Sequence, residues 1–244
     1  MFRAREWDAY FPASSMEGAI TGQVREMGID PLAAGRVLLD TGERAGKRSR
    51  AFCAPVRVPE EVYLVLRPHG GQTDWNTFLH ELGHALHFAY MRPDLAFEYR
   101  WLGDNSITEG YAMLFDHLMQ NPSWLLRYSG LGKPRLQGFM RSAGFEELHF
   151  LRRYCAKLLY EIEFHQADEP TALRPRYVEL QADALKITPA PEDYLWDMDA
   201  SFYVHAYLRA WALEAQIGTF LREQFGNDWF ARRSAGSLLR ELWS

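Results

Sequence analysis

The chain has 244 residues, of which 48% are hydrophobic and 24% charged, and its formal net charge is −5. This composition excludes an intrinsically disordered chain, its acidic balance gives no electrostatic basis for binding nucleic acid, and its two cysteines exclude a disulfide scaffold. We find neither a signal-peptide pattern nor an apolar run of the ~20 residues that a membrane span requires, so we expect a cytoplasmic protein with no membrane partner.

The first part of the chain predicts one helix and two short strands. A serine pair, apolar residues on one face and Gly28 predict a helix over 14–28. The polar, glycine-punctuated stretch 41–50 carries a basic run, which is more typical of a solvated loop than of a phosphate or nucleic-acid patch. The β-rich runs 51–58 and 61–67 are broken by prolines, as is typical of edge strands.

From residue 73 onward the pattern is helical. Thr73 or Asp74 is expected to cap the first of these helices, and Pro93 and Pro122 follow the ends of the first and second. Proline-bearing linkers, such as Lys133-Pro134, separate later helices. The ranges of the expected helices are 73–90, 105–120, 145–166, 175–187 and 199–224. Because no repeat or boundary divides the chain, we predict a single, mainly α domain over 1–244, with a small β element before the helix at 73.

The motif His80-Glu81-Leu82-Gly83-His84 lies on the first of these helices. Positions i and i+4 of a helix share a face, so both imidazoles can reach one metal ion at ~2.0–2.1 Å, the zinc–nitrogen distance. The carboxylate of Glu81 lies where it can take a proton from a water on that metal. Such ligands favour zinc without excluding manganese or cobalt. The opposing interpretation is a chance match in a purely helical structural protein.

A catalytic zinc site needs a third protein ligand, and three residues are candidates. His87 is two helical turns from His80, at ~10 Å along the same face, so one straight helix cannot bring both to one ion. Glu109 follows His84 by 25 residues, which leaves room for a second helix to pack back on the first. His117, further along that second helix, is the rival of Glu109.

Two residues near Glu109 have expected roles. Gly110 would permit the second helix to approach the first closely. Asp116 lies seven residues beyond Glu109. It either orients His80 or His84 through the free ring N–H or is a surface carboxylate on an amphipathic helix.

The stretches 46–53 and 74–87, with the 25-residue gap to Glu109, resemble the oligoendopeptidase F and thimet oligopeptidase family of zinc peptidases. The resemblance covers roughly 29–223. It implies a zincin-like (gluzincin) catalytic domain that holds one Zn²⁺ per chain through His80, His84 and Glu109. In such a domain Glu81 is the general base.

The run 199–208 is similar to the family's tyrosine-rich helix, which faces the zinc. Tyr207 falls where the family has a tyrosine, and we predict that it stabilises the oxyanion, with His205 as its rival. Tyr203 shares a helix face with Tyr207, whereas His205 points about 160° away, so the three cannot all face the metal. The opposing interpretation is a core stripe formed by Tyr203, Tyr207 and Trp211.

The chain departs from the family's pattern in three ways. Ala112 stands three residues after Glu109, where the family has serine or a similar small residue. The residues Trp-Asp-Met-Asp at 196–199 stand where the family has a histidine and a tyrosine in a glycine-rich loop. The family also has a large helical N-terminal half that closes a channel over the site. Two expectations follow: an N-terminal portion or a partner chain covers the cleft, or the chain is a minimal version of the enzyme with an open cleft.

With these residues, the resemblance implies a zinc-dependent peptidase that hydrolyses bonds in short peptides. One alternative is a module that binds zinc and peptides without cleaving them. Another is a carboxypeptidase, which needs a basic residue to hold the terminal carboxylate. The arginines available for that role are Arg152, Arg153, Arg174, Arg176 and Arg209.

Overall fold

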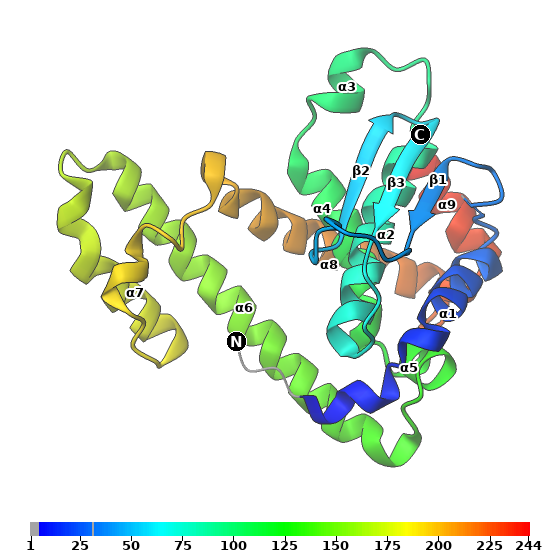
Figure 1. The fold of residues 1–244 in the computed structure, drawn as a ribbon, viewed down its shortest axis with the longest axis horizontal. Coiled ribbons are helices and arrows are strands. Elements are labelled where there is room, and N and C mark those ends of the chain that lie inside the picture. Colours follow the sequence, from blue (N-terminus) through cyan, green and yellow to red (C-terminus); the bar gives the residue numbers. More distant parts are fainter. Residues whose placement is uncertain (1–4, 31) are drawn as a thin grey trace.

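The computed structural model describes residues 5–30 and 32–244. Its fold is mainly α, with one small sheet of three strands (Figure 1), which confirms the predicted fold class. None of the helices in these residues has both the length and the apolar character needed to cross a membrane.

The sheet contains β1 (Val37–Asp40), β2 (Phe52–Arg57) and β3 (Glu61–Val65), in the order β1-β3-β2. β3 pairs in parallel with β1 and antiparallel with β2. The prediction of two edge strands is therefore correct for β2 and wrong for β3, which is central. Pro59 and Pro68 flank β3 without interrupting it, so its N–H groups are all available for pairing. The four-residue strand β1 was not predicted.

The loop between β1 and β2 was predicted to be solvated, but its Lys47 is buried. The side chain of Lys47 is 1% exposed, and its ammonium group donates to the carboxylate and carbonyl of Asp40 and to the carbonyl of Gly42. The Lys47 ammonium thereby fixes the loop that leads into β2. The charge pattern of the stretch 41–50 does not indicate that one of its lysines has this structural role.

Two helices form the centre of the fold, α2 (Gln72–Tyr90) and α4 (Asn105–Asp116). α2 agrees with the predicted range, although its N-cap is Gly71. Asp74 instead accepts hydrogen bonds from the backbone N–H groups of His69 and Gly70. α4 is shorter than predicted, because 117–120 form a 3-10 turn.

Gly83 allows α2 and α4 to approach each other closely. A Cβ atom at Gly83 would lie 2.6 Å from the Cα of Ala112 and 2.6 Å from the carbonyl oxygen of Tyr111. The expectation that Gly110 serves this approach is wrong: a Cβ there would lie 2.8 Å from the side chain of Leu213. Gly110 therefore allows α8 (Val204–Phe225) to pack closely against the other side of α4.

We expect Gly83→Ala to lower the free energy of unfolding by about 1–3 kcal/mol, as overpacked cores do. The new methyl group would collide with the backbone of α4, which outweighs the ~1 kcal/mol by which alanine favours a helix. Gly18→Ala in α1 (Ala13–Glu26) is the control, because a Cβ there meets nothing within 4 Å. Urea unfolding measures both variants; equal effects would contradict the close approach at Gly83.

The longest helix, α6 (Lys133–Gln166), extends away from the sheet and carries α7 (Arg174–Leu185) at its far end (Figure 1). The prediction of Lys133-Pro134 as a linker is wrong, because α6 begins at Lys133. Proline is tolerated in the first turn, where its missing N–H would have no helical partner. α8 begins later than predicted, after Ser201 with its positive φ of 59°. The remaining helices are α3 (Phe97–Trp101), α5 (Pro122–Tyr128) and α9 (Arg233–Trp243).

Candidate metal centre

The packing of α2 on α4 brings His80, His84 and Glu109 together. One ligand atom of each lies within 4.8 Å of the others. The Nε2 atoms of His80 and His84 are 3.4 Å and 3.6 Å from Oε2 of Glu109. That carboxylate oxygen is buried and has no hydrogen-bond partner. A buried oxygen without a partner, facing two imidazole nitrogens, fits a divalent cation, and the mixed nitrogen and oxygen donor set fits zinc.

Hydrogen bonds orient the two histidines among the candidate ligands. Nδ1 of His80 lies 2.8 Å from Oδ2 of Asp116, and Nδ1 of His84 lies 2.8 Å from Oγ1 of Thr108. Each contact leaves the Nε2 atom directed at the centre. Of the two interpretations of Asp116, the structure therefore supports the one in which it orients His80. The role of Thr108 was not predicted, because a threonine at the start of a helix gives no signal for it.

The sheet positions Glu81 beside the three candidate ligands. Its Oε2 accepts a hydrogen bond of 2.7 Å from the backbone N–H of Cys53 on β2. Burial raises the pKa of Glu81, while His80 and this N–H act in the opposite direction. A carboxylate whose pKa is raised toward neutrality is a better proton acceptor in catalysis.

The two histidines differ in charge when no metal is bound. Burial lowers the pKa of His84 to about 4, so its imidazole is neutral. Burial also disfavours the charged form of His80, but Asp116 and Glu109 outweigh it and raise the pKa of His80 to about 10. Burial raises the pKa of Glu109, yet the neighbouring His80 outweighs this and the net shift is downward. The metal-free centre therefore holds a proton on His80 at neutral pH.

We expect zinc binding at pH 7–8 to release about one proton, because His80 must lose its proton before Nε2 can coordinate. Apparent zinc affinity should rise with pH until the pH reaches about 10, the pKa of His80. Calorimetric titrations in buffers of different ionisation enthalpy measure the release. Asp116→Asn should reduce the release, because it removes one of the charges that hold the proton. Zinc binding without proton release at pH 7.5 would contradict this assignment.

The two rival ligands lie outside the group formed by His80, His84 and Glu109. His87 is buried against Tyr111, with ring centroids 5.0 Å apart, and burial lowers its pKa to about 3. Nδ1 of His117 lies 3.0 Å from Oε2 of Glu214, and its Nε2 lies 3.4 Å from Oε1 of Glu147. Burial opposes the charged form of His117, but these carboxylates raise its pKa well above its ordinary value.

The three residues of the tyrosine-rich segment have different surroundings. The hydroxyl of Tyr203 donates to Oε1 of Glu109 at 2.9 Å. The ring of Tyr207 lies between those of Tyr203 and Tyr154, at centroid distances of 5.0 Å and 5.3 Å. His205 instead contacts Phe202, through its Nδ1 at 2.6 Å from the backbone carbonyl and through ring stacking.

The five arginines considered for a terminal carboxylate already have partners. Arg152 donates to backbone carbonyls of Asp183 and Ala184, near the end of α7. Each of the other four forms an ion pair with a carboxylate. These pairs are Arg153 with Asp197, Arg174 with Glu192, Arg176 with Glu163, and Arg209 with Asp104. The structure gives none of the five a clear advantage as a carboxylate receptor.

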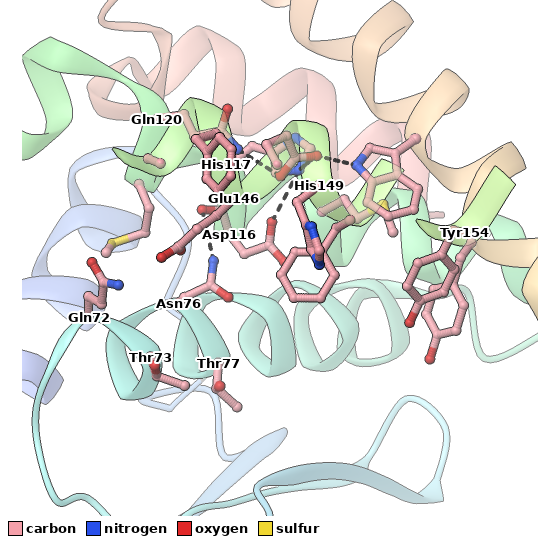
Figure 2. A pocket seen from close by; sticks show the side chains of 18 of the residues that line it. Gln72, Thr73, Asn76, Thr77, Asp116, His117, Gln120, Glu146, His149 and Tyr154 are labelled. Carbon is pink, nitrogen blue, oxygen red and sulfur yellow. Dashed lines mark hydrogen bonds and ion pairs between the residues drawn. The ribbon is translucent and has the colours of Figure 1, made fainter. Parts of the chain in front are cut away.

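A pocket of about 410 Å³ lies beside the metal centre, among residues of α2, α4, α6 and α8 (Figure 2). Asp116, which contacts His80, and Tyr207 both line it. Thr77 and Asn76 form part of its α2 wall, and Tyr154 of α6 lies near one end (Figure 2). This pocket was not predicted from the sequence, because its walls come from segments far apart in the chain.

No protein-family model matches this sequence, and no curated protein matches it. A solved structure described as "The Structure of CHT" is similar in fold, with a TM-score of 0.64 and 17% sequence identity. The match covers 99% of this chain and 54% of that one, so the chain spans about half the length of this structural relative. At this identity the similarity concerns the fold alone.

Proposed function

We propose that the chain is a zinc-dependent peptidase of the oligoendopeptidase F and thimet oligopeptidase type, which hydrolyses short peptides. The observation that carries the proposal is the convergence of His80, His84 and Glu109, with Glu81 held beside them by the edge strand β2. A zinc ion in this position would polarise a carbonyl group and lower the pKa of a water toward ~7. That is the chemistry required for hydrolysis of an amide bond.

Glu81 has the position and protonation behaviour of a general base. One of its oxygens is fixed by the Cys53 N–H, which restricts the rotation of the carboxylate beside the ligands. Glu81 accepts a proton from water and returns it to the leaving amine. The N–H of Cys53 shows that one side of the edge strand β2 faces the centre, where an extended peptide could align by strand addition.

Tyr207 is the stronger of the two tyrosines as a donor to the developing oxyanion. Tyr203 already donates to Glu109, whereas the hydroxyl of Tyr207 makes no hydrogen bond within the described part of the chain. Burial and the charge of Glu109 raise the pKa of Tyr207, so its hydroxyl remains protonated and able to donate. A donor of this kind contributes ~2.7–4 kcal/mol to catalysis.

The proposal also includes the cellular compartment of the enzyme and the covering of its cleft. Cys53 and Cys155 are free thiols, as suits a reducing, cytoplasmic compartment. An N-terminal portion or a partner chain would cover the cleft and limit access to short peptides.

Zinc content and peptide cleavage test the proposal together. We expect the purified chain, loaded with zinc, to cleave a mixture of short peptides, to lose activity with a chelator and to regain it with zinc. Zinc binding with no cleavage would favour a module that binds zinc and peptides. Absence of zinc binding by the folded chain would contradict the centre itself.

A further inference from the structure

We propose that the 410 Å³ pocket beside the metal centre receives a large apolar or aromatic side chain of the peptide, one or two residues from the cleaved bond. The inference rests on the proposed peptidase function and adds a side-chain preference to it. Four properties of the pocket support a side chain of this kind: its position, its walls, its charged groups and its size.

The position of the pocket follows from α2. Asn76 and Thr77, which line it, precede His80 by four and three residues and therefore share its helix face. At 1.5 Å per residue, the pocket begins about 4.5–6 Å from the level of His80. An extended peptide advances ~3.3–3.6 Å per residue. A peptide whose carbonyl lies at the centre thus reaches the pocket with a side chain one or two residues away.

The walls of the pocket are rich in aromatic rings. They come from the start and middle of α6 and from α8, on the side opposite α2 (Figure 2). These rings offer large, rigid apolar faces, which favour contact with aliphatic or aromatic groups. The aromatic residues that line the pocket are Phe139, Phe145, Phe150, Tyr154, Tyr207 and Trp211.

The charged groups next to His117 in the pocket are paired with one another. His117 lies between Glu147 and Glu214, and its raised pKa keeps it charged. Glu147 also accepts hydrogen bonds from the indole of Trp211 and the amide of Gln120. A charged guest would have to compete for these carboxylates, whereas an apolar guest leaves the network intact. The network therefore favours an apolar side chain.

The pocket has room for a bulky side chain. Its volume of about 410 Å³ lies within the ~300–1,000 Å³ range of sites that hold small molecules, so a large aromatic group enters without steric conflict. Lysine and arginine are absent from the described residues that line it, so an acidic side chain would find neither of these partners there. Burial of a whole apolar side chain there should favour Phe or Leu over Ala by roughly 10- to 100-fold in kcat/KM.

Cleavage-site profiling tests the preference. The zinc-loaded chain is incubated with a mixture of short peptides, and mass spectrometry identifies each cleaved bond. We expect large apolar and aromatic residues at one fixed position relative to that bond. Enrichment of Arg or Lys at that position would overturn the apolar assignment, and so would the absence of any enrichment.

Filling variants connect the preference to the pocket. Ala143 lines the pocket from α6, so Ala143→Trp should remove most of the preference for Phe over Ala. Ala143→Leu should reduce it partly and serves if the tryptophan variant does not fold, as judged by circular dichroism. Leu148→Trp is the matched control, because Leu148 is an exposed α6 residue outside the lining. An equal effect of Leu148→Trp, or an unchanged preference in a folded Ala143 variant, would overturn the proposal.

Peptide binding separates this proposal from the proposed activity. Calorimetry measures the binding of matched Phe and Ala peptides to the zinc-loaded Glu81→Gln chain. Tighter binding of the Phe peptide, lost in the double variant with Ala143→Trp, would support the pocket even if the wild-type chain cleaves nothing. Equal binding of both peptides would overturn the pocket whether or not the chain is a peptidase.

Discussion

Glu81→Gln is expected to lower peptide hydrolysis by about 10²- to 10⁴-fold, the usual contribution of a general base. The amide has the shape of the carboxylate, and its oxygen can still accept the N–H of Cys53. It cannot accept a proton from water at neutral pH. Zinc content should remain at one per chain, because Glu81 is not among the three candidate ligands. Steady-state cleavage of a short peptide and metal analysis by mass spectrometry measure the two properties.

The pH dependence of the wild-type enzyme supplies a second readout for Glu81. Burial raises the pKa of this carboxyl, so kcat/KM should fall as the pH decreases through that raised value. Glu179→Gln on α7 is the control, because Glu179 is exposed and distant in the chain from the motif. Turnover near the wild-type rate in zinc-loaded Glu81→Gln would show that Glu81 is not the base.

The part of the candidate site that sequence could predict is the part that helix geometry dictates. The i, i+4 spacing places His80 and His84 on one face, and the position of Glu109 near the start of the next helix allows it to return to that face. The close approach itself was assigned to Gly110, although Gly83 provides it. A glycine within a helix indicates that something lies near it, but the sequence does not say which neighbour.

Two predictions about secondary structure were wrong because they depended on contacts between distant segments of the chain. Two prolines made β3 resemble an edge strand, yet β1, only four residues long, pairs with its other side. Pro134 resembled a linker residue, yet it lies in the first turn of α6. In each case the same local residue is compatible with two structures, and contacts made by distant segments decide between them.

The hydrogen bonds around the centre were predictable only in part. Asp116 lies two turns beyond Glu109 on the same helix, so a contact with the ligands followed from spacing as one of two interpretations. His117 and Glu147 come from separate segments, and their pairing depends on where α6 passes the 3-10 turn formed by 117–120. The sequence analysis treated His117 as a rival ligand. In the structure His117 instead forms ion pairs with Glu147 and Glu214.

The second large effect is expected from the ligands. His84→Ala should lose zinc, because two remaining protein ligands rarely retain it when structural and catalytic sites use three or four. Glu109→Ala should weaken zinc binding more than the ~10- to 100-fold typical of residues that only orient a ligand. Asp116→Asn should fall within that range, because Asp116 contacts His80 without facing the metal. Metal analysis and calorimetric titration with zinc measure this order.

His117→Ala separates loss of metal from loss of stability. This variant should keep its zinc, because His117 lies between Glu147 and Glu214 rather than among the three candidate ligands. It should nevertheless unfold more easily, by about 1–3 kcal/mol, because two partly buried carboxylates would lose their cation. Denaturant unfolding of the metal-free proteins measures this difference.

The pattern across these variants decides between three descriptions of the centre. Loss of zinc in His84→Ala and Glu109→Ala, with retention in His117→Ala, would establish the three ligands on α2 and α4. Retention in Glu109→Ala with loss in His117→Ala would make His117 the third ligand. A folded wild-type chain that binds no zinc would mean that these three side chains converge without forming a metal site unaided. Assembly would then require an N-terminal portion or a partner chain over the cleft.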